Sequence, residues 1–224
     1  MYFCKNFVKI VHALFIRHFR AYIEQHSDAE PTLLQALSRE THLKIIQPRM
    51  ITGHFQGRFL SLLSKIVAPK KILEIGTYTG YSALCLAEGL SKDGTLHTIE
   101  VNPELAAIQK KYFDKSNYTT QIKTYIGDAL DIIPTLEGPF DLVFIDAEKK
   151  QYDAYFEAVI KKSKPGTVIL SDNVLWTGKV VEPLNPKDKT TQVLLDYNKK
   201  LAEDPRVQTS LLPIRDGLTM SRVI

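Results

Sequence analysis

Short apolar runs alternate with amphipathic stretches from Lys70 to the end of the chain. Runs rich in Val, Ile and Leu that are too short for a helix predict buried strands, and apolar residues at helical spacing predict helices between them. The predicted strands are residues 70–76, 94–101, 121–128, 140–147, 167–174, 207–214 and 218–224. The predicted helices are residues 29–47, 53–67, 81–90, 103–116, 129–136, 153–163 and 190–204, and residues 175–189 are expected to be a loop.

Regular alternation of strands and helices indicates an α/β fold. It predicts a mostly parallel seven-stranded sheet with helices on both faces. Arg215-Asp216-Gly217 separates the last two strands and is a hairpin signal, so the sheet should end in a C-terminal antiparallel hairpin. In sheets of this kind ligands bind at the carboxyl ends of the strands.

The first residues of the chain have a different pattern, which predicts an amphipathic helix. Its apolar positions are Phe7, Ile10, Val11, Leu14 and Phe15. Basic residues interrupt the apolar run, which argues against a signal peptide, and no run is long enough to span a membrane. The helix could pack on the domain or on a second subunit, touch a membrane surface, or be an extension without a folded role. We expect residues 1–50 to form an N-terminal helical extension and cap, and residues 51–224 to form the main domain.

Composition narrows the class of protein. The chain has 224 residues, 44% of them hydrophobic, which is enough for a sizeable core. The net charge of +4 is mild, and Lys and Arg are spread along the chain, so nucleic acid is not an expected partner. Cys4 and Cys85 are the two cysteines; they form no metal-binding or disulfide pattern, which is typical of a cytoplasmic protein.

Two of the buried strands end in charged or amide side chains. Asp146 ends the strand at residues 140–147 and is followed closely by Glu148 and Lys149, and Asp172-Asn173 ends the strand at residues 167–174. Oxygen ligands at the carboxyl ends of two strands indicate a binding site. The alternative for the two aspartates is helix capping or a surface turn.

The turn after the first strand carries a second signal. Gly76 allows a sharp turn and close approach of a ligand, and the following helix offers unpaired N–H groups. Glu100 ends the next strand, 24 positions beyond Gly76, where an acid can accept hydrogen bonds from a ribose. The G-x-x-x-G spacing of Gly76 and Gly80 differs from the G-x-G-x-x-G of NAD sites and suits a nucleoside with a small zwitterionic tail. A turn that only closes a βα unit is the alternative.

Seven motifs in order carry a resemblance to a known family. They are MITGHFQGRFL, ILEIGTYTGYS, HTIEVNP, YIGDA, FIDAEKKQY, SDNVLWTG and RDGLTMSR. Together they resemble the cation-dependent O-methyltransferases of the caffeoyl-CoA and catechol type, from about Thr32 to the C-terminus. That family belongs to the class I S-adenosylmethionine-dependent methyltransferases, so the resemblance implies a Rossmann-like fold. The segments LLQALSRETH and DPRV look more like its bacterial branch.

The resemblance implies a divalent-cation site and a general base. Its metal ligands correspond to Asp146, Asp172 and Asn173, and these hard oxygen donors suit Mg²⁺, with Ca²⁺ or Mn²⁺ as alternatives. The family's general base corresponds to Lys149, whereas Lys150 is interpreted as a solvated surface charge.

The resemblance also implies a set of S-adenosylmethionine contacts. They are Thr52, Glu74, Gly76, Thr77, Ser82, Glu100, Ala129 and Glu148. Glu74 could instead be a structural acid. For Asp128, which precedes Ala129, helix capping is a simpler alternative role.

The acceptor implied by the resemblance is a vicinal diol of catechol type, with Trp176 and Thr177 in the wall of its pocket. Plant caffeoyl-CoA enzymes commonly have Asn at the position of Thr177. The resemblance is therefore not taken to imply that caffeoyl-CoA is the substrate. Trp176 could instead plug the core. The alternatives in function are a methyltransferase of the same fold that acts on tRNA, a peptide or an antibiotic intermediate, and a non-catalytic module that binds S-adenosylmethionine. The family is usually dimeric, which implies a homodimer.

Overall fold

A computed structural model describes residue 19 and residues 21–224 of the chain. The amphipathic helix predicted around residues 7–15 lies outside the described residues, and the proposed division at residue 50 stays a prediction. Within the described part, no helix is long and apolar enough to cross a bilayer.

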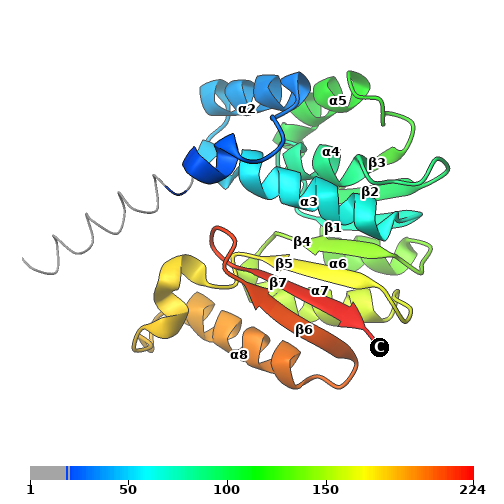
Figure 1. Ribbon diagram of the computed structural model, residues 1–224. Coiled ribbons are helices and arrows are strands. Elements are labelled where there is room, and N and C mark those ends of the chain that lie inside the picture. Colours follow the sequence, from blue (N-terminus) through cyan, green and yellow to red (C-terminus); the bar gives the residue numbers. More distant parts are fainter. Residues whose placement is uncertain (1–18, 20) are drawn as a thin grey trace, which may run out of the picture.

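One seven-stranded sheet forms the centre of the molecule, as predicted (Figure 1). Its strands are β1 Lys71–Ile75, β2 Thr95–Glu100, β3 Ile122–Ile126, β4 Leu142–Ile145, β5 Val168–Asp172, β6 Val207–Leu212 and β7 Leu218–Val223. Their order in the sheet is β3-β2-β1-β4-β5-β7-β6. The first five strands are parallel, and β7 pairs antiparallel with both β5 and β6. The order changes direction between β1 and β4, which is where ligands bind in open α/β sheets.

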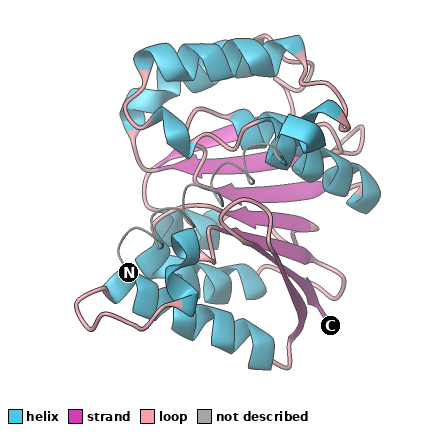
Figure 2. Cartoon of the chain, turned by 60° about the vertical axis from the view of Figure 1, so that its left-hand side comes forward, coloured by secondary structure: helices cyan, strands magenta, loops and turns pink. Residues whose placement is uncertain are grey.

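Helices cover both faces of the sheet (Figure 2). They are α2 Thr32–Lys44, α3 His54–Val67, α4 Tyr81–Ala87, α5 Ala106–Asp114, α6 Ala129–Ile132, α7 Tyr152–Ile160 and α8 Lys189–Glu203. Short 3₁₀ helices lie at η1 Pro48–Met50, η2 Pro103–Leu105, η3 Ile133–Thr135, η4 Lys149–Gln151 and η5 Trp176–Val181.

The side chains of the central strands are divided between two hydrophobic clusters, one on each face. In β4, Leu142 and Phe144 belong to the cluster that contains residues of α2 to α5, whereas Val143 and Ile145 belong to the cluster of α6, α7 and α8. All four residues of β4 are fully buried, because this strand lies in the middle of a sheet covered on both sides.

Several predicted boundaries were wrong. The helix predicted at 29–47 begins after Pro31, which is its N-cap, and ends at Lys44. The strand predicted at 207–214 stops at Leu212, because Pro213 has no N–H for the ladder. The loop predicted at 175–189 contains η5, in which Trp176, Thr177 and Gly178 all have positive φ.

Candidate functional site

The carboxyl ends of β4 and β5 bring Asp146 and Asp172 side by side. Ile145 pairs with Ser171 across the two strands, so the residues that follow them are neighbours. Asp172 is only 2% exposed. Burial and then the negative charge of Asp146 raise the pKa of Asp172 from 3.8 to about 7.

Asn173 follows Asp172 in the left-handed conformation, with φ of 60°. Its backbone N–H donates to Asp172 Oδ1 at 2.8 Å. No group of three or more His, Cys, Asp and Glu side chains placed to hold a metal occurs among the described residues. The predicted ligand set contains two such residues and an amide, and its hard oxygen donors fit a divalent cation such as Mg²⁺.

Lys149 lies beside the same pair of strands, in η4. Its Nζ is 2.8 Å from Asp146 Oδ1 and 2.8 Å from Tyr152 Oη. Only 11% of its side chain is exposed, whereas Lys150 is exposed, as predicted for a surface charge.

Tyr152 is a site residue that sequence analysis missed. Its buried hydroxyl donates to the backbone oxygen of Asp172 at 2.8 Å and accepts from Lys149. It therefore joins the end of β5 to the lysine that follows β4. A tyrosine on the buried face of an amphipathic helix has the sequence signal of an ordinary core residue.

Glu74 lies in β1 and is fully buried. Its Oε2 accepts a hydrogen bond of 2.5 Å from Thr98 Oγ1, and its buried Oε1 has no partner. Burial raises the pKa of Glu74 to about 8, although the nearby hydroxyls of Ser82 and Thr98 oppose the shift. An unsatisfied buried carboxylate oxygen is costly, and a ligand that donates a hydrogen bond would satisfy it.

Gly76 closes the turn after β1 at the point where β1 meets β4. Its φ is +98°, and a Cβ built on it would lie 1.9 Å from the carbonyl oxygen of Asp146. The structure thus explains this glycine by both its conformation and its close contact with the neighbouring strand end.

Glu100 ends β2 and lies next to the same turn. Its Oε2 accepts from the backbone N–H of Tyr78 at 2.7 Å, and its Oε1 accepts from that of Asn102 at 2.9 Å. Each oxygen keeps a lone pair for a further donor such as a ribose hydroxyl. Thr77 directs its hydroxyl to Thr98 Oγ1 at 2.5 Å, and its backbone N–H donates to the carbonyl oxygen of Ile99 at 3.2 Å, so the residue is held at the end of β2.

The remaining predicted contacts lie around this edge of the sheet. Ala129 is buried at the start of α6. Asp128 caps that helix by accepting from Leu130 N at 2.8 Å, which is the alternative role considered for it. Glu148 is exposed and caps η4 by accepting from Lys150 N at 3.1 Å.

Trp176 and Thr177 follow β5 in strained backbone conformations, with φ of 48° and 54°. The Trp176 side chain is partly buried against the second hydrophobic cluster, and Thr177 is exposed. The backbone N–H of Thr177 donates to Asp216 Oδ1 in the β6–β7 turn.

Thr52 is buried in residues 51–53, the strap that precedes α3. Its carbonyl oxygen accepts from Arg215 of the β6–β7 turn, which also reaches Gln56 in α3. Sequence analysis included Arg215 and Gln56 in motifs but assigned no role in the site to either residue. A glutamine on the buried face of α3 is the signal that could have identified one of them.

The chain is similar in sequence to known O-methyltransferases. A family model described as O-methyltransferase matches residues 24–224. The chain is similar to a catechol O-methyltransferase of Niastella koreensis, with 40% identity over 185 residues that cover 79% of this chain and 83% of that protein. It is also similar to caffeoyl-CoA O-methyltransferase 1 of Zea mays, with 37% identity over 204 residues, 86% of this chain and 79% of that protein.

A solved structure with a similar fold is the S-adenosylhomocysteine-bound methyltransferase PaMTH1 of Podospora anserina. It superposes with a TM-score of 0.86 at 30% identity and covers 94% of this chain and 95% of that one. The match to the family model spans almost the whole described chain, and the fold and the sequence agree with it. This chain belongs to the O-methyltransferase family.

Proposed function

We propose that this protein transfers a methyl group from S-adenosylmethionine to a hydroxyl of a catechol-type small molecule, with a divalent cation, most simply Mg²⁺, at Asp146, Asp172 and Asn173. The observation that carries the proposal is the meeting of Asp146, Asp172 and Lys149 at the carboxyl ends of β4 and β5. Family membership supports methyl transfer to oxygen, and the similarity to a catechol O-methyltransferase supports the acceptor class.

The cofactor is proposed to bind across the ends of β1, β2 and β4. Glu100 would hold the ribose. The positive amino group of the methionine end would favour the ionised form of Glu74, whose unpartnered Oε1 would then accept a hydrogen bond from it. Gly76 permits this approach because it has no side chain. Thr52, Thr77, Ser82, Ala129 and Glu148 complete the proposed set.

A bound cation would supply Lewis acidity, which favours the ionised form of a phenolic hydroxyl. Lys149, in its neutral form, takes the proton from that hydroxyl at Nζ and later releases it to solvent. The acceptor oxygen then attacks the methyl carbon, and the C–S bond breaks to leave neutral S-adenosylhomocysteine. Asp146 and Tyr152 keep Nζ of Lys149 at the strand ends. Fewer conformations of the lysine side chain therefore have to be excluded before proton transfer.

The acceptor wall is proposed to include Trp176 and Thr177. The left-handed backbone at both residues is strained and is held by the β6–β7 turn, which is common at ligand-binding segments. The homodimer and the cytoplasmic location stay predictions.

The test is methyl transfer from labelled S-adenosylmethionine to a panel of catechols, with Mg²⁺ and then with EDTA. We expect transfer that EDTA abolishes and that Asp172→Ala loses while it still binds S-adenosylhomocysteine. Methyl transfer at an unchanged rate in the presence of EDTA would refute the cation site. Binding of S-adenosylhomocysteine without transfer to any catechol would refute the acceptor class.

A further inference from the structure

Gln56 is an uncharged amide buried directly beside an acidic residue of the proposed cation site. It lies in α3 and is fully buried. Its Nε2 donates to Asp172 Oδ2 at 2.8 Å, and its Oε1 accepts from Arg215 Nη1 at 3.2 Å. The side chain therefore connects a surface arginine to a buried carboxylate.

Only one orientation of the Gln56 amide satisfies both neighbours. A carboxylate can only accept hydrogen bonds, and a guanidinium can only donate them. The amide oxygen must then face Arg215, and the amide nitrogen must face Asp172. Arg215 thus determines which end of the amide reaches the carboxylate.

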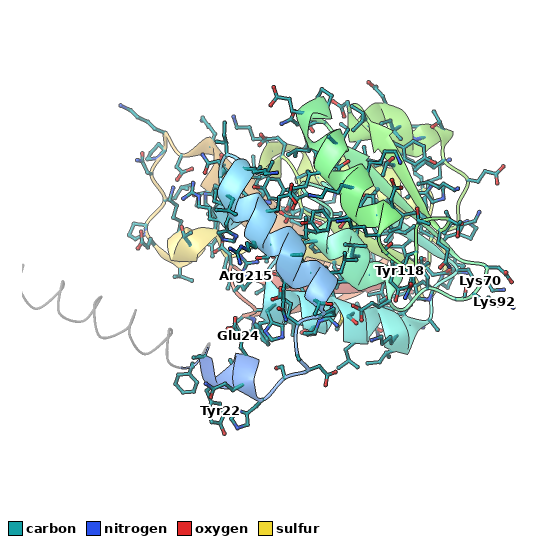
Figure 3. All side chains as sticks on the ribbon, turned by 90° about the horizontal axis from the view of Figure 1, so that it is seen from above. Tyr22, Glu24, Lys70, Lys92, Tyr118 and Arg215 are labelled. Atoms are coloured by element: carbon teal, nitrogen blue, oxygen red, sulfur yellow. The ribbon has the colours of Figure 1, made fainter. Side chains whose placement is uncertain are left out.

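Arg215 occupies the turn between β6 and β7. Figure 1 shows this turn at the same end of the sheet as the start of α3. Figure 3 places Arg215 at the opposite end of the molecule from Lys70, which precedes β1. Its Nη1 also lies 3.1 Å from the carbonyl oxygen of Ile51 and bonds to that of Thr52. One guanidinium therefore holds the strap before α3 and the Gln56 side chain together.

The next two residues of the turn hold the segment that follows β5. The carbonyl oxygen of Asp216 accepts from Leu175 N at 2.8 Å, and that of Gly217 accepts from Val174 N at 3.2 Å. Hydrogen bonds thus fix the β6–β7 turn both to the strap before α3 and to the segment after β5. These contacts keep Arg215 within reach of Gln56.

The two oxygens of Asp172 each receive one donor. Oδ1 accepts from Asn173 N and Oδ2 accepts from Gln56, so the rotation of the carboxylate is fixed. Each oxygen keeps a lone pair for a cation, and a neutral amide adds no positive charge to repel it. A cationic side chain at residue 56 would compete with the metal.

We propose that Gln56 and Arg215 are a positioning pair, in which Arg215 orients the Gln56 amide and the amide orients the Asp172 carboxylate toward a bound cation. The inference rests on the proposed cation site. Its distinctive consequence is a separation of roles: Gln56 acts on cation affinity, and Arg215 acts on cation and cofactor affinity, because it also holds the carbonyl of Thr52.

The test is calorimetric titration of the purified protein with MnCl₂ and, separately, with S-adenosylhomocysteine. Gln56→Met keeps the length of the side chain and removes both hydrogen bonds. We expect its affinity for Mn²⁺ to fall about 10- to 100-fold, the usual effect of losing a residue that orients a metal ligand. Its affinity for S-adenosylhomocysteine should be unchanged.

Arg215→Met should weaken the binding of both Mn²⁺ and S-adenosylhomocysteine. Arg215 is exposed, so this variant keeps the core and carries the test if Gln56→Met fails to fold. Arg222→Met is the matched control, because Arg222 is an exposed arginine of the same hairpin, in β7. Both of its affinities should equal those of the wild type.

The possible failures are distinguishable. In one outcome the wild type binds Mn²⁺, Asp172→Ala does not, and the folded variants Gln56→Met and Arg215→Met both bind Mn²⁺ as tightly as the wild type. This outcome would overturn the positioning pair and leave the proposed function intact. Mn²⁺ binding that is absent from the wild type or survives in Asp172→Ala would overturn the cation site, and the positioning pair with it.

Discussion

At the scale of single residues, two adjacent lysines show how local position decides role. Lys149 is largely buried and bonds to Asp146 and Tyr152, whereas Lys150 is exposed. The two residues have the same side-chain chemistry and are adjacent in sequence. A difference between their variants therefore reports on the position of Nζ and not on net charge.

We expect Lys149→Met to lower kcat about 10²- to 10⁴-fold, the usual contribution of a general base. Binding of S-adenosylhomocysteine should be retained, because the loss affects proton transfer. Lys150→Met, with the same change in charge, should keep wild-type kcat. Steady-state methyl transfer with both variants is the measurement, and equal activity of the two would contradict the assignment of Lys149.

At the scale of elements, the turn between β1 and α4 shows why a glycine is required there. Gly76 has positive φ and faces the backbone of Asp146, which cannot move without displacing the end of β4. Gly178 in η5 also has positive φ, +81°, but a Cβ there would meet nothing within 4 Å. Comparing alanine variants of Gly76 and Gly178 therefore separates two contributions to the free energy of unfolding. One is the strain of a side chain at positive φ, and the other is the steric clash of its Cβ with the neighbouring strand.

Gly178→Ala should destabilise the protein by about 1–2 kcal/mol, the cost of a left-handed conformation with a side chain. Gly76→Ala should cost more, and it should also weaken the binding of S-adenosylhomocysteine, since the strand ends must separate. Thermal unfolding and calorimetric titration of the two variants provide the measurements. Similar unfolding temperatures for both would mean that contact with β4 contributes little.

At the scale of the whole molecule, two hydrophobic clusters on either face of the sheet enclose acidic groups that burial makes hard to ionise. Glu74 is fully buried, and its pKa is raised from 4.5 to about 8. The folded state therefore holds a proton that the unfolded state loses above its own pKa. The stabilisation is complete below pH 4.5 and is lost as pH rises toward about 8.

Glu74→Gln should remove this dependence, so the stability of the variant should fall less between pH 4.5 and 8 than that of the wild type. One such group changes the free energy of unfolding by at most about 1.4 kcal/mol per pH unit. Asp172 acts in the same direction and remains in the variant, whereas Glu40 and Glu157, with lowered pKa values, act in more acidic solution. Denaturant unfolding across this range, without cofactor or metal, is the measurement. Parallel curves for the two proteins would refute the buried, protonated state of Glu74.

Much of the fold could be predicted because its signals are local. Apolar runs and helical spacing located every strand and the helices from Thr32 onward, and the hairpin signal located the antiparallel edge. The boundaries at Lys44 and Leu212 and the 3₁₀ helix at residues 176–181 were missed, because tertiary contacts decide where a marginal element stops.

The sequence by itself determined the family, the parallel order of the strand–helix units, and the placement of Asp146 and Asp172 at strand ends, because these depend on residue type and spacing along the chain. Only the tertiary structure decided which side chains meet. Arg215, Gln56 and Asp172 are far apart in sequence, yet hydrogen bonds join them, and Tyr152 joins Lys149 to the end of β5. The physical reason is that a hydrogen bond between distant segments depends on the packing of whole elements, which no local pattern encodes.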